Sequence, residues 1–198
     1  MRKNSLYTLH PGFAKEESSL RNLKERTGRD LEEWIRIVKK SGPATEKERA
    51  AWLKREHGFT TNYAGWVAER AGGAGGSADY DPDALVETLF SGKKAGLRPI
   101  YDHLLKLAFG IGKDVRVSPC KTMVPFYRKH VFAQAKPSTN TRIDVGFALK
   151  DLEPTGKLIS TGGFEKGDRI THRIPVESVE EIDKEVKKWL KHAYEMDV

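Results

Sequence analysis

The sequence predicts an α+β protein: a small all-α N-terminal domain, followed by an α+β domain built on one antiparallel sheet with its helices packed on one face. Apolar residues recur at helical spacing early in the chain and alternate with polar residues at strand spacing further on. A Gly- and Ser-rich stretch separates the two patterns. We therefore expect a loose N-terminal arm over residues 1–15, a helical domain over 16–71, a linker over 72–80 and the α+β domain over 81–198.

Composition narrows the class of protein. The chain has 198 residues, of which 38% are hydrophobic, and no apolar run is long enough to span a bilayer. Met1-Arg2-Lys3 is not followed by the apolar segment of a signal peptide, so we expect a cytoplasmic protein. The single cysteine, Cys120, excludes an internal disulfide and a cysteine-based zinc site. The histidines lack metal-binding spacing and no motif indicates a cofactor, so we expect neither.

Start and stop signals divide the N-terminal domain into four short helices. Asp30 is a good N-cap, and Gly28 before it is a typical C-cap. Thr45 forms a capping box with Glu48, and Thr61 is the expected cap of the last helix. The helices are predicted over residues 16–26, 31–40, 45–57 and 62–71. Three tryptophans within them indicate a core built on aromatic side chains.

The second domain is predicted to begin with helices and to continue as a strand meander. Asp81-Pro82 opens a short helix, and Arg98-Pro99 opens a longer one. Six strands are predicted near residues 115–117, 122–129, 130–136, 142–150, 158–160 and 169–176. Pro125, within the second strand, predicts an edge position or a bulge. Ser178 and Glu181 form a capping box that opens the last helix.

Positive charge is concentrated in the predicted sheet. Between Lys113 and Arg142, seven lysines and arginines face one acidic residue, so this segment carries +6 of the chain's net +7. The strand over 142–150 alternates, with apolar side chains on one side and charged ones on the other. The apolar set is Ile143, Val145, Phe147 and Leu149, and the charged set is Arg142, Asp144 and Lys150. A sequence pI near 9.4 favours anionic partners.

Several stretches resemble known domains. The signature of a small bacterial helical domain of unknown function resembles WLKREHGFTTNYAGWVA, at residues 52–68. A second domain of unknown function is similar to LRPIYDHLL, SPCKTMVPFYRKHVFAQAKPSTNTRIDVGFAL, DRITHRI and EIDKEVKKWLKHAY. The resemblance covers nearly the whole chain and implies a two-domain bacterial family whose C-terminal fold is one antiparallel sheet with packed helices. It implies no established activity. The second domain also looks distantly related to proteins likened to frataxin-type iron chaperones, whose acidic ridges contrast with the basic sheet here.

The polar face of the sheet is the strongest candidate site. Arginine forks and lysine ammonium groups on a sheet suit phosphate or carboxylate ligands. Phe126, Tyr127 and Phe132 are available to stack on bases. The candidate ligand-binding residues are Lys121, Arg128, Lys129, Lys136, Arg142, His172 and Arg173. The plainer interpretation is a solvated face, which any one-sided antiparallel sheet needs.

Three further features are open to a functional or a structural interpretation. His172 is a general base if a carboxylate such as Asp168 orients it, and otherwise a structural histidine. Cys120, beside Lys121, is either a nucleophile activated by the neighbouring cation or an inert thiol. The two helices joined at Gly58 fit a helix-turn-helix, although the second offers few polar side chains to read bases.

We therefore predict a non-catalytic module that binds an anionic ligand through the basic face of the C-terminal sheet, with nucleic acid as the leading candidate. Binding through about four to six phosphates would weaken steeply with added salt. Two alternatives remain open. One is an enzyme acting on a small anionic substrate, with Arg128, Arg142, His172 or Arg173 in a pocket. The other is a protein-interaction adaptor that docks a partner through exposed aromatic side chains of the helical domain.

Overall fold

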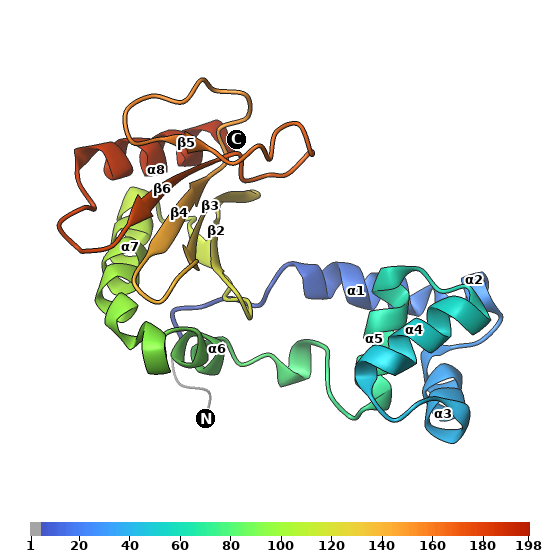
Figure 1. The fold of residues 1–198 in the computed structure, drawn as a ribbon. Helices are drawn as coiled ribbons and strands as arrows, with labels where there is room; N and C mark the ends of the chain where they lie inside the picture. The colour runs from blue at the N-terminus through green and yellow to red at the C-terminus, as the bar shows by residue number, and fades with distance from the viewer. Residues whose placement is uncertain (1–4) are drawn as a thin grey trace. The chain divides into compact units, whose positions relative to one another are not determined.

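The computed structural model describes residues 5–198, which divide into two compact units. One unit spans Leu9–Tyr80, and the other combines residues 5–8 with residues 81–198 (Figure 1). The helical first unit and the mixed helix-and-sheet second unit confirm the predicted α+β class. None of the described helices is both long enough and apolar enough to span a membrane.

The described residues of the N-terminal unit form helices joined by loops, with no strand. Its elements are α1 (Gly12–Arg21), α2 (Leu23–Thr27), α3 (Leu31–Ser41), α4 (Glu46–His57), α5 (Thr61–Ala71) and the 3-10 helix η1 (Ser77–Asp79). The single helix predicted over 16–26 is two helices, because the backbone leaves helical geometry at Asn22. Asparagine is a poor residue for a helix interior, since its amide competes for backbone hydrogen bonds.

The caps predicted at Asp30 and Thr45 are confirmed, whereas α5 has Thr60 and not Thr61 as its N-cap, without a side-chain hydrogen bond. The Asp30 carboxylate accepts a hydrogen bond from the Glu33 N–H at 2.9 Å, and the Glu33 carboxylate accepts one from the Asp30 N–H at 2.8 Å. Thr45 and Glu48 form the second capping box. α4 ends at Gly58, whose φ of 67° lies in the left-handed region that favours glycine.

The core of the N-terminal unit is built around Trp34. This side chain is 2% exposed, and its indole N–H donates to Thr27 Oγ1 at 2.8 Å, so its polar group is satisfied despite burial. Leu53 is fully buried in the same cluster, whereas Trp52 and Trp66 lie half-buried at its edge. Of the three tryptophans of this unit, Trp34 is therefore buried in the core, while Trp52 and Trp66 keep part of their surface exposed.

The C-terminal unit is one antiparallel sheet with helices that cover it. Its helices are α6 (Pro82–Leu89), η2 (Gly92–Leu97, 3-10), α7 (Arg98–Ile111) and α8 (Lys184–Met196). Its strands are β1 (Arg116–Val117), β2 (Val124–Tyr127), β3 (Val131–Pro137), β4 (Ile143–Phe147), β5 (Ile159–Ser160) and β6 (His172–Val176). They lie in the order β1-β2-β3-β4-β6-β5. Each predicted strand is present; β3 is as long as predicted but displaced by one residue, and the other five are shorter than the pattern indicated.

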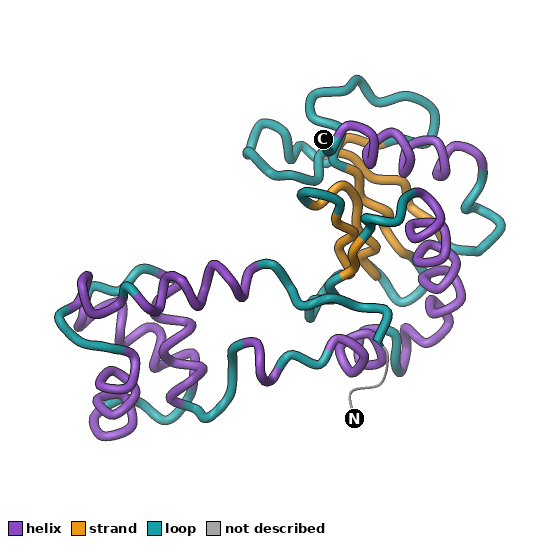
Figure 2. The backbone as a smooth tube through the Cα atoms, turned by 180° about the vertical axis from the view of Figure 1, so that it is seen from behind, coloured by secondary structure: helices purple, strands orange, loops and turns teal. Residues whose placement is uncertain are grey.

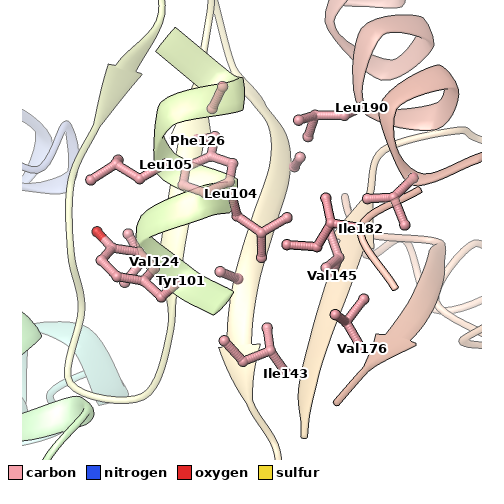
Figure 3. Close-up of a cluster of buried hydrophobic side chains, with 14 of the residues drawn as sticks. Tyr101, Leu104, Leu105, Val124, Phe126, Ile143, Val145, Val176, Ile182 and Leu190 are labelled. Carbon is pink, nitrogen blue, oxygen red and sulfur yellow. The ribbon is translucent and has the colours of Figure 1, made fainter. Parts of the chain in front are cut away.

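α7 and α8 pack on one face of the sheet (Figure 1, Figure 2). Figure 3 shows side chains from α7, from the strands and from α8 meeting in one apolar cluster, among them Leu104, Val145 and Leu190. All three are at most 1% exposed. Because this face is committed to the core, only the opposite side of the sheet can present charged groups. We call that opposite side the helix-free face.

Pro125 lies inside β2, which has β1 on one side and β3 on the other. The β2–β3 register shifts between Phe126 and Tyr127, so that Phe132 is an extra residue on β3. Pro125 itself pairs in register with Gln134, so the irregularity lies beside the proline, on β3, and the predicted edge position is not observed.

The segment before α1 is held in place rather than loose. The Thr8 N–H donates to the Val117 carbonyl at 2.8 Å, and the Tyr101 hydroxyl donates to the Tyr7 hydroxyl at 3.0 Å. This segment therefore satisfies a carbonyl of β1, which would otherwise be an unpaired edge strand. The structure thus differs from the arm predicted over 1–15, of which the first four residues lie outside the described part of the chain.

The last helix starts later than predicted. α8 begins at Lys184 with Asp183 as its N-cap, and this carboxylate accepts from two N–H groups of the first turn, at 2.9 and 3.2 Å. Glu181 instead accepts from the Glu177 N–H at 2.7 Å, which closes a turn before the helix. An aspartate that satisfies two N–H groups outcompetes the box predicted from Ser178.

We predict that Phe126→Ala lowers the free energy of unfolding of the C-terminal unit by about 3–5 kcal/mol, because the ring is fully buried and its removal leaves a cavity. Urea unfolding followed through the NMR signal of the Trp189 indole reports on this unit. The control is Phe164→Ala, because Phe164 is 53% exposed and its loss should change stability by about 0.5 kcal/mol or less. Equal effects of the two changes would contradict the core assignment.

Candidate anion-binding face

The alternation of side chains along β4 determines which residues lie on the helix-free face. Its apolar residues face the helices, so Asp144 and Gly146 point the other way. Residues directly opposite each other in an antiparallel pair share a face. Lys136 of β3 opposes Asp144, Arg173 of β6 opposes Gly146, and Arg142 precedes Asp144 by two residues. We call Lys136, Arg142, Asp144 and Arg173 the charged cluster.

Asp144 holds both arginines of the charged cluster. Arg173 Nη1 donates to Asp144 Oδ1 at 3.0 Å, and Arg142 Nε lies 3.1 Å from the same oxygen. The second contact is an ion pair without hydrogen-bond alignment, since the buried Arg142 Nε–H has no acceptor among the described residues. The side chain of Asp144 is 15% exposed, whereas those of Arg142 and Arg173 are 32% and 31% exposed. Each guanidinium therefore keeps N–H groups for a ligand.

The charged cluster has a positive balance. Three cations surround one carboxylate, which leaves a net charge of +2. Partly exposed ion pairs contribute about 0–1 kcal/mol to stability, so their larger effect here is orientation. Asp144 fixes two planar guanidinium groups, which can then donate paired hydrogen bonds to phosphate or carboxylate oxygens. The Lys94 ammonium group is used at the end of β3, where its Nζ donates to the Pro137 carbonyl at 2.7 Å.

Gly146 leaves room for the segment that precedes β6. A Cβ at this position would lie 2.7 Å from Ile170 Cγ2 and 2.9 Å from Gln134 Cγ, so any other residue would displace one of them. Ile170 therefore covers the middle of the helix-free face, and the charged cluster lies beside it.

Arg128 lies just before the start of β3, at the end opposite Lys136, and its guanidinium contacts other groups of the same unit. Its Nε donates to Asp114 Oδ2 at 3.0 Å, and its guanidinium lies 4.5 Å from the centroid of the Tyr194 ring. Its Nη1 also donates to the carbonyls of Tyr194 and Asp197, at 3.3 and 3.5 Å. A cation is favourable here because the C-terminus of a helix carries unpaired carbonyls. Arg128 therefore fastens the β2–β3 turn to the end of α8.

The two remaining lysines are exposed but separate from the cluster. Lys129 lies in the turn between β2 and β3, and Lys121 lies in the loop between β1 and β2. Of the predicted binding residues, the structure brings together Lys136, Arg142 and Arg173.

His172 is buried, with 2% of its surface exposed. Its Nε2 lies 2.7 Å from the Leu152 carbonyl oxygen, and its Nδ1 lies 2.9 Å from Thr171 Oγ1. Both ring nitrogens of His172 therefore form hydrogen bonds within the domain, in place of the predicted ligand contact.

Burial raises the pKa of the Cys120 thiol, which disfavours the thiolate that a nucleophile needs.

The aromatic side chains expected to stack on bases are not accessible. Phe126 and Phe132 are fully buried, and Tyr127 is 8% exposed. The helix-free face therefore offers charge without the aromatic platform that binds unstacked bases.

A second charged group, which the sequence did not indicate, surrounds Asp197. This carboxylate accepts from the His130 N–H at 2.7 Å, lies 3.0 Å from His130 Nδ1 and accepts from Arg169 Nη2 at 2.5 Å. Asp197 and Arg169 also line a cavity of about 320 Å³. No local sequence signal connects Asp197 with His130, because they are 67 residues apart.

The enzyme alternative places Arg128, Arg142, His172 or Arg173 in a pocket. Neither this cavity nor a second one in the N-terminal unit is lined by Arg128, Arg142, His172 or Arg173. Among the described residues, no group of three or more His, Cys, Asp or Glu side chains is arranged to hold a metal ion.

α5 offers few groups to a DNA groove. Arg70 pairs with Glu16 at 2.5 Å, and their side chains are only 15% and 9% exposed. Arg70 also donates to the Trp66 carbonyl. The most basic side chain of the expected reading helix is thus used within the unit, which favours a structural role for the α4–α5 pair.

Comparison with protein families identifies both domains. Residues 86–197 match the model of a domain of unknown function, DUF5655, and residues 16–71 match that of another, DUF4287. The chain belongs to the DUF5655 family. The resemblance to a two-domain family is thereby confirmed, and the DUF5655 match contains the whole sheet and the charged cluster. Searches of curated proteins and of solved structures gave no match.

We predict that Asp197 makes the stability of the C-terminal unit depend on pH. Burial alone would raise the pKa of this carboxyl, but the hydrogen bonds from His130 and the charges of Arg169 and His130 outweigh burial and lower it. The unfolded chain therefore takes up this proton first, near pH 4. The stabilisation is complete above that pH and is lost as the pH falls through the lower pKa of the folded state.

Asp197→Asn should lower the free energy of unfolding at pH 7 by about 1–3 kcal/mol and flatten its decline in acid. Urea unfolding at pH 7 and at several values below pH 4 measures both effects. Asp151→Asn is the control, because Asp151 is exposed. If Asp197→Asn leaves the acid decline as steep as in the parent protein, this role of Asp197 is wrong.

Proposed function

We propose that the C-terminal domain is a non-catalytic module that binds an anionic ligand, with nucleic acid as the leading candidate, at the charged cluster. A cytoplasmic location is part of the proposal. One observation supports it above the others: Arg142 and Arg173 are held by the same carboxylate, with Lys136 opposite that carboxylate on the next strand.

The arginines of the charged cluster are held in place before any ligand binds. A flexible arginine loses side-chain entropy when it binds, and this loss opposes association. Arg142 and Arg173 have already lost part of that freedom to Asp144. Their forks therefore present donors at fixed positions to oxygens of one phosphate or of two adjacent phosphates.

The site's position favours a polymer over an enclosed small molecule. Small-molecule sites are concave and bury most of their ligand. The cluster instead lies on a sheet face and lines neither of the two cavities described for this chain. An extended phosphate backbone can follow such a surface, because each phosphate needs only a local contact.

The structure changes the expected character of binding. Arg128 is used internally and the aromatic side chains are buried, so three cations remain at the site. Three phosphate contacts give a slope of about −2 to −3 in a plot of log K against log salt on duplex DNA, which is shallower than four to six contacts would give. Without base stacking, we expect little sequence preference.

Asp144→Asn/Arg142→Gln/Arg173→Gln tests the proposal without stranding an unpaired carboxylate. It removes two positive charges and one negative charge, so the net charge falls by one. Binding to a short fluorescent duplex should weaken about tenfold or more at low salt, and the salt slope should decrease by about 2. Fluorescence anisotropy measures both.

Lys191→Gln is the matched control, because it also lowers the net charge by one and lies on α8, where its side chain is 68% exposed. It should change affinity by about twofold or less. Equal losses in the two variants would show that net charge alone attracts DNA. Absence of any anisotropy change for the parent protein with DNA or RNA at low salt would also overturn the proposal.

A further inference from the structure

The N-terminal unit contains a cavity of about 430 Å³ between the α2–α3 connection and the α4–α5 turn. Its volume lies in the range of small-molecule sites, which begins at about 300 Å³. The part of the wall formed by Trp34 and Phe59 is rigid, since these residues are 2% and 7% exposed and their rings meet edge to face. This part of the wall therefore belongs to the packed core, whereas Arg26, Arg29 and His57 are exposed.

Charge in this cavity is of one sign. Arg26, Arg29 and His57 line it, and none of its ten lining residues is acidic. Neither Arg26 nor Arg29 forms an ion pair with a described residue. Two guanidinium groups without a carboxylate partner at one concave site leave an unbalanced positive potential, which attracts an anion.

Both arginines are positioned by aromatic rings. The guanidinium carbon of Arg26 lies 5.1 Å from the centroid of the Tyr63 ring, and that of Arg29 lies 5.3 Å from the Trp34 ring. Such cation–π contacts orient the guanidinium plane while leaving most of its N–H groups unused. The Tyr63 and Trp34 rings thus orient Arg26 and Arg29, as Asp144 orients the arginines of the charged cluster. Unlike a carboxylate, the rings do not neutralise the positive charge.

His57 supplies a third polar group at a fixed place. Its ring meets those of Trp34 and Trp52 edge to face, with centroids 4.9 and 4.6 Å away. No described residue forms a hydrogen bond with its ring nitrogens. A histidine clamped in this way can donate to a ligand oxygen without first losing ring rotation.

We propose that this cavity binds a small molecule that carries a phosphoryl group, with Arg26 and Arg29 as the main ligand-binding residues and His57 as a further donor. A phosphoryl group offers three oxygens and up to two negative charges, which matches two guanidinium forks and an imidazole better than a single carboxylate does. The volume leaves room for a ring beyond the phosphoryl group. This site lies on a different domain from the charged cluster and does not depend on it.

Phenyl phosphate is the probe, titrated into the full chain while the NMR signals of the four tryptophan indoles are followed. The Trp34 indole lies in the cavity wall and should shift and saturate, whereas that of Trp189 in α8 should not move. Phenol, which has the same ring without the phosphoryl group, should bind at least about tenfold more weakly, because it forms no charge-assisted hydrogen bonds.

Arg26→Gln/Arg29→Gln should weaken the binding of phenyl phosphate about tenfold or more. Arg21→Gln/Arg36→Gln is the matched control: it removes the same charge from exposed positions on α1 and α3 and should change affinity by about twofold or less. The triple variant of the charged cluster should bind phenyl phosphate normally, so the two proposals can fail separately.

Three results would overturn this site. They are an unchanged Trp34 signal at saturating phenyl phosphate, equal affinity for phenol and phenyl phosphate, and equal losses in the two double variants. The first two use the parent protein, so they hold even if a variant folds poorly.

Discussion

The pairing of β4 with β3 and β6 is the constraint on which the C-terminal unit depends. β4 lies between these two strands, and its apolar residues alternate with Asp144 and Gly146. A slip of one residue would turn the apolar set to solvent and bury the carboxylate in the core. Core packing therefore fixes the register, and the register places Lys136 and Arg173 beside Asp144. The charged cluster follows from the same pattern that stabilises the sheet.

Local chemistry made most of the fold predictable. The Asp30 and Thr45 caps, the strands and the alternation of β4 all depend on residues near one another in sequence. The alternation of β6 also predicts the position of His172. This residue lies two residues before the buried Ile174, so both side chains point to the core face of the sheet. Reading that alternation would have removed His172 from the candidate site.

What could not be predicted depends on contacts between distant segments. Nothing near Arg128 in the sequence indicates that the end of α8 reaches it, and nothing near Asp197 indicates His130 or Arg169. The number of charges in a segment also says nothing about the distant groups that contact them. A segment with +6 suggested one continuous basic surface, but partners outside the segment or across strands engage several of those charges. Composition counts charges, whereas tertiary structure decides which of them reach solvent.

The attachment of Thr8 to Val117 changes the topology of the whole chain. Because residues 5–8 belong to the same unit as residues 81–198, the helical unit is an insertion with two connections rather than a domain on one tether. A protease that cuts within the glycine-rich stretch 72–76 would therefore leave both pieces associated through the contacts of Thr8 and Tyr7. Separating the domains requires a second cut near residue 9, and the C-terminal unit prepared without its first residues would expose the edge of β1.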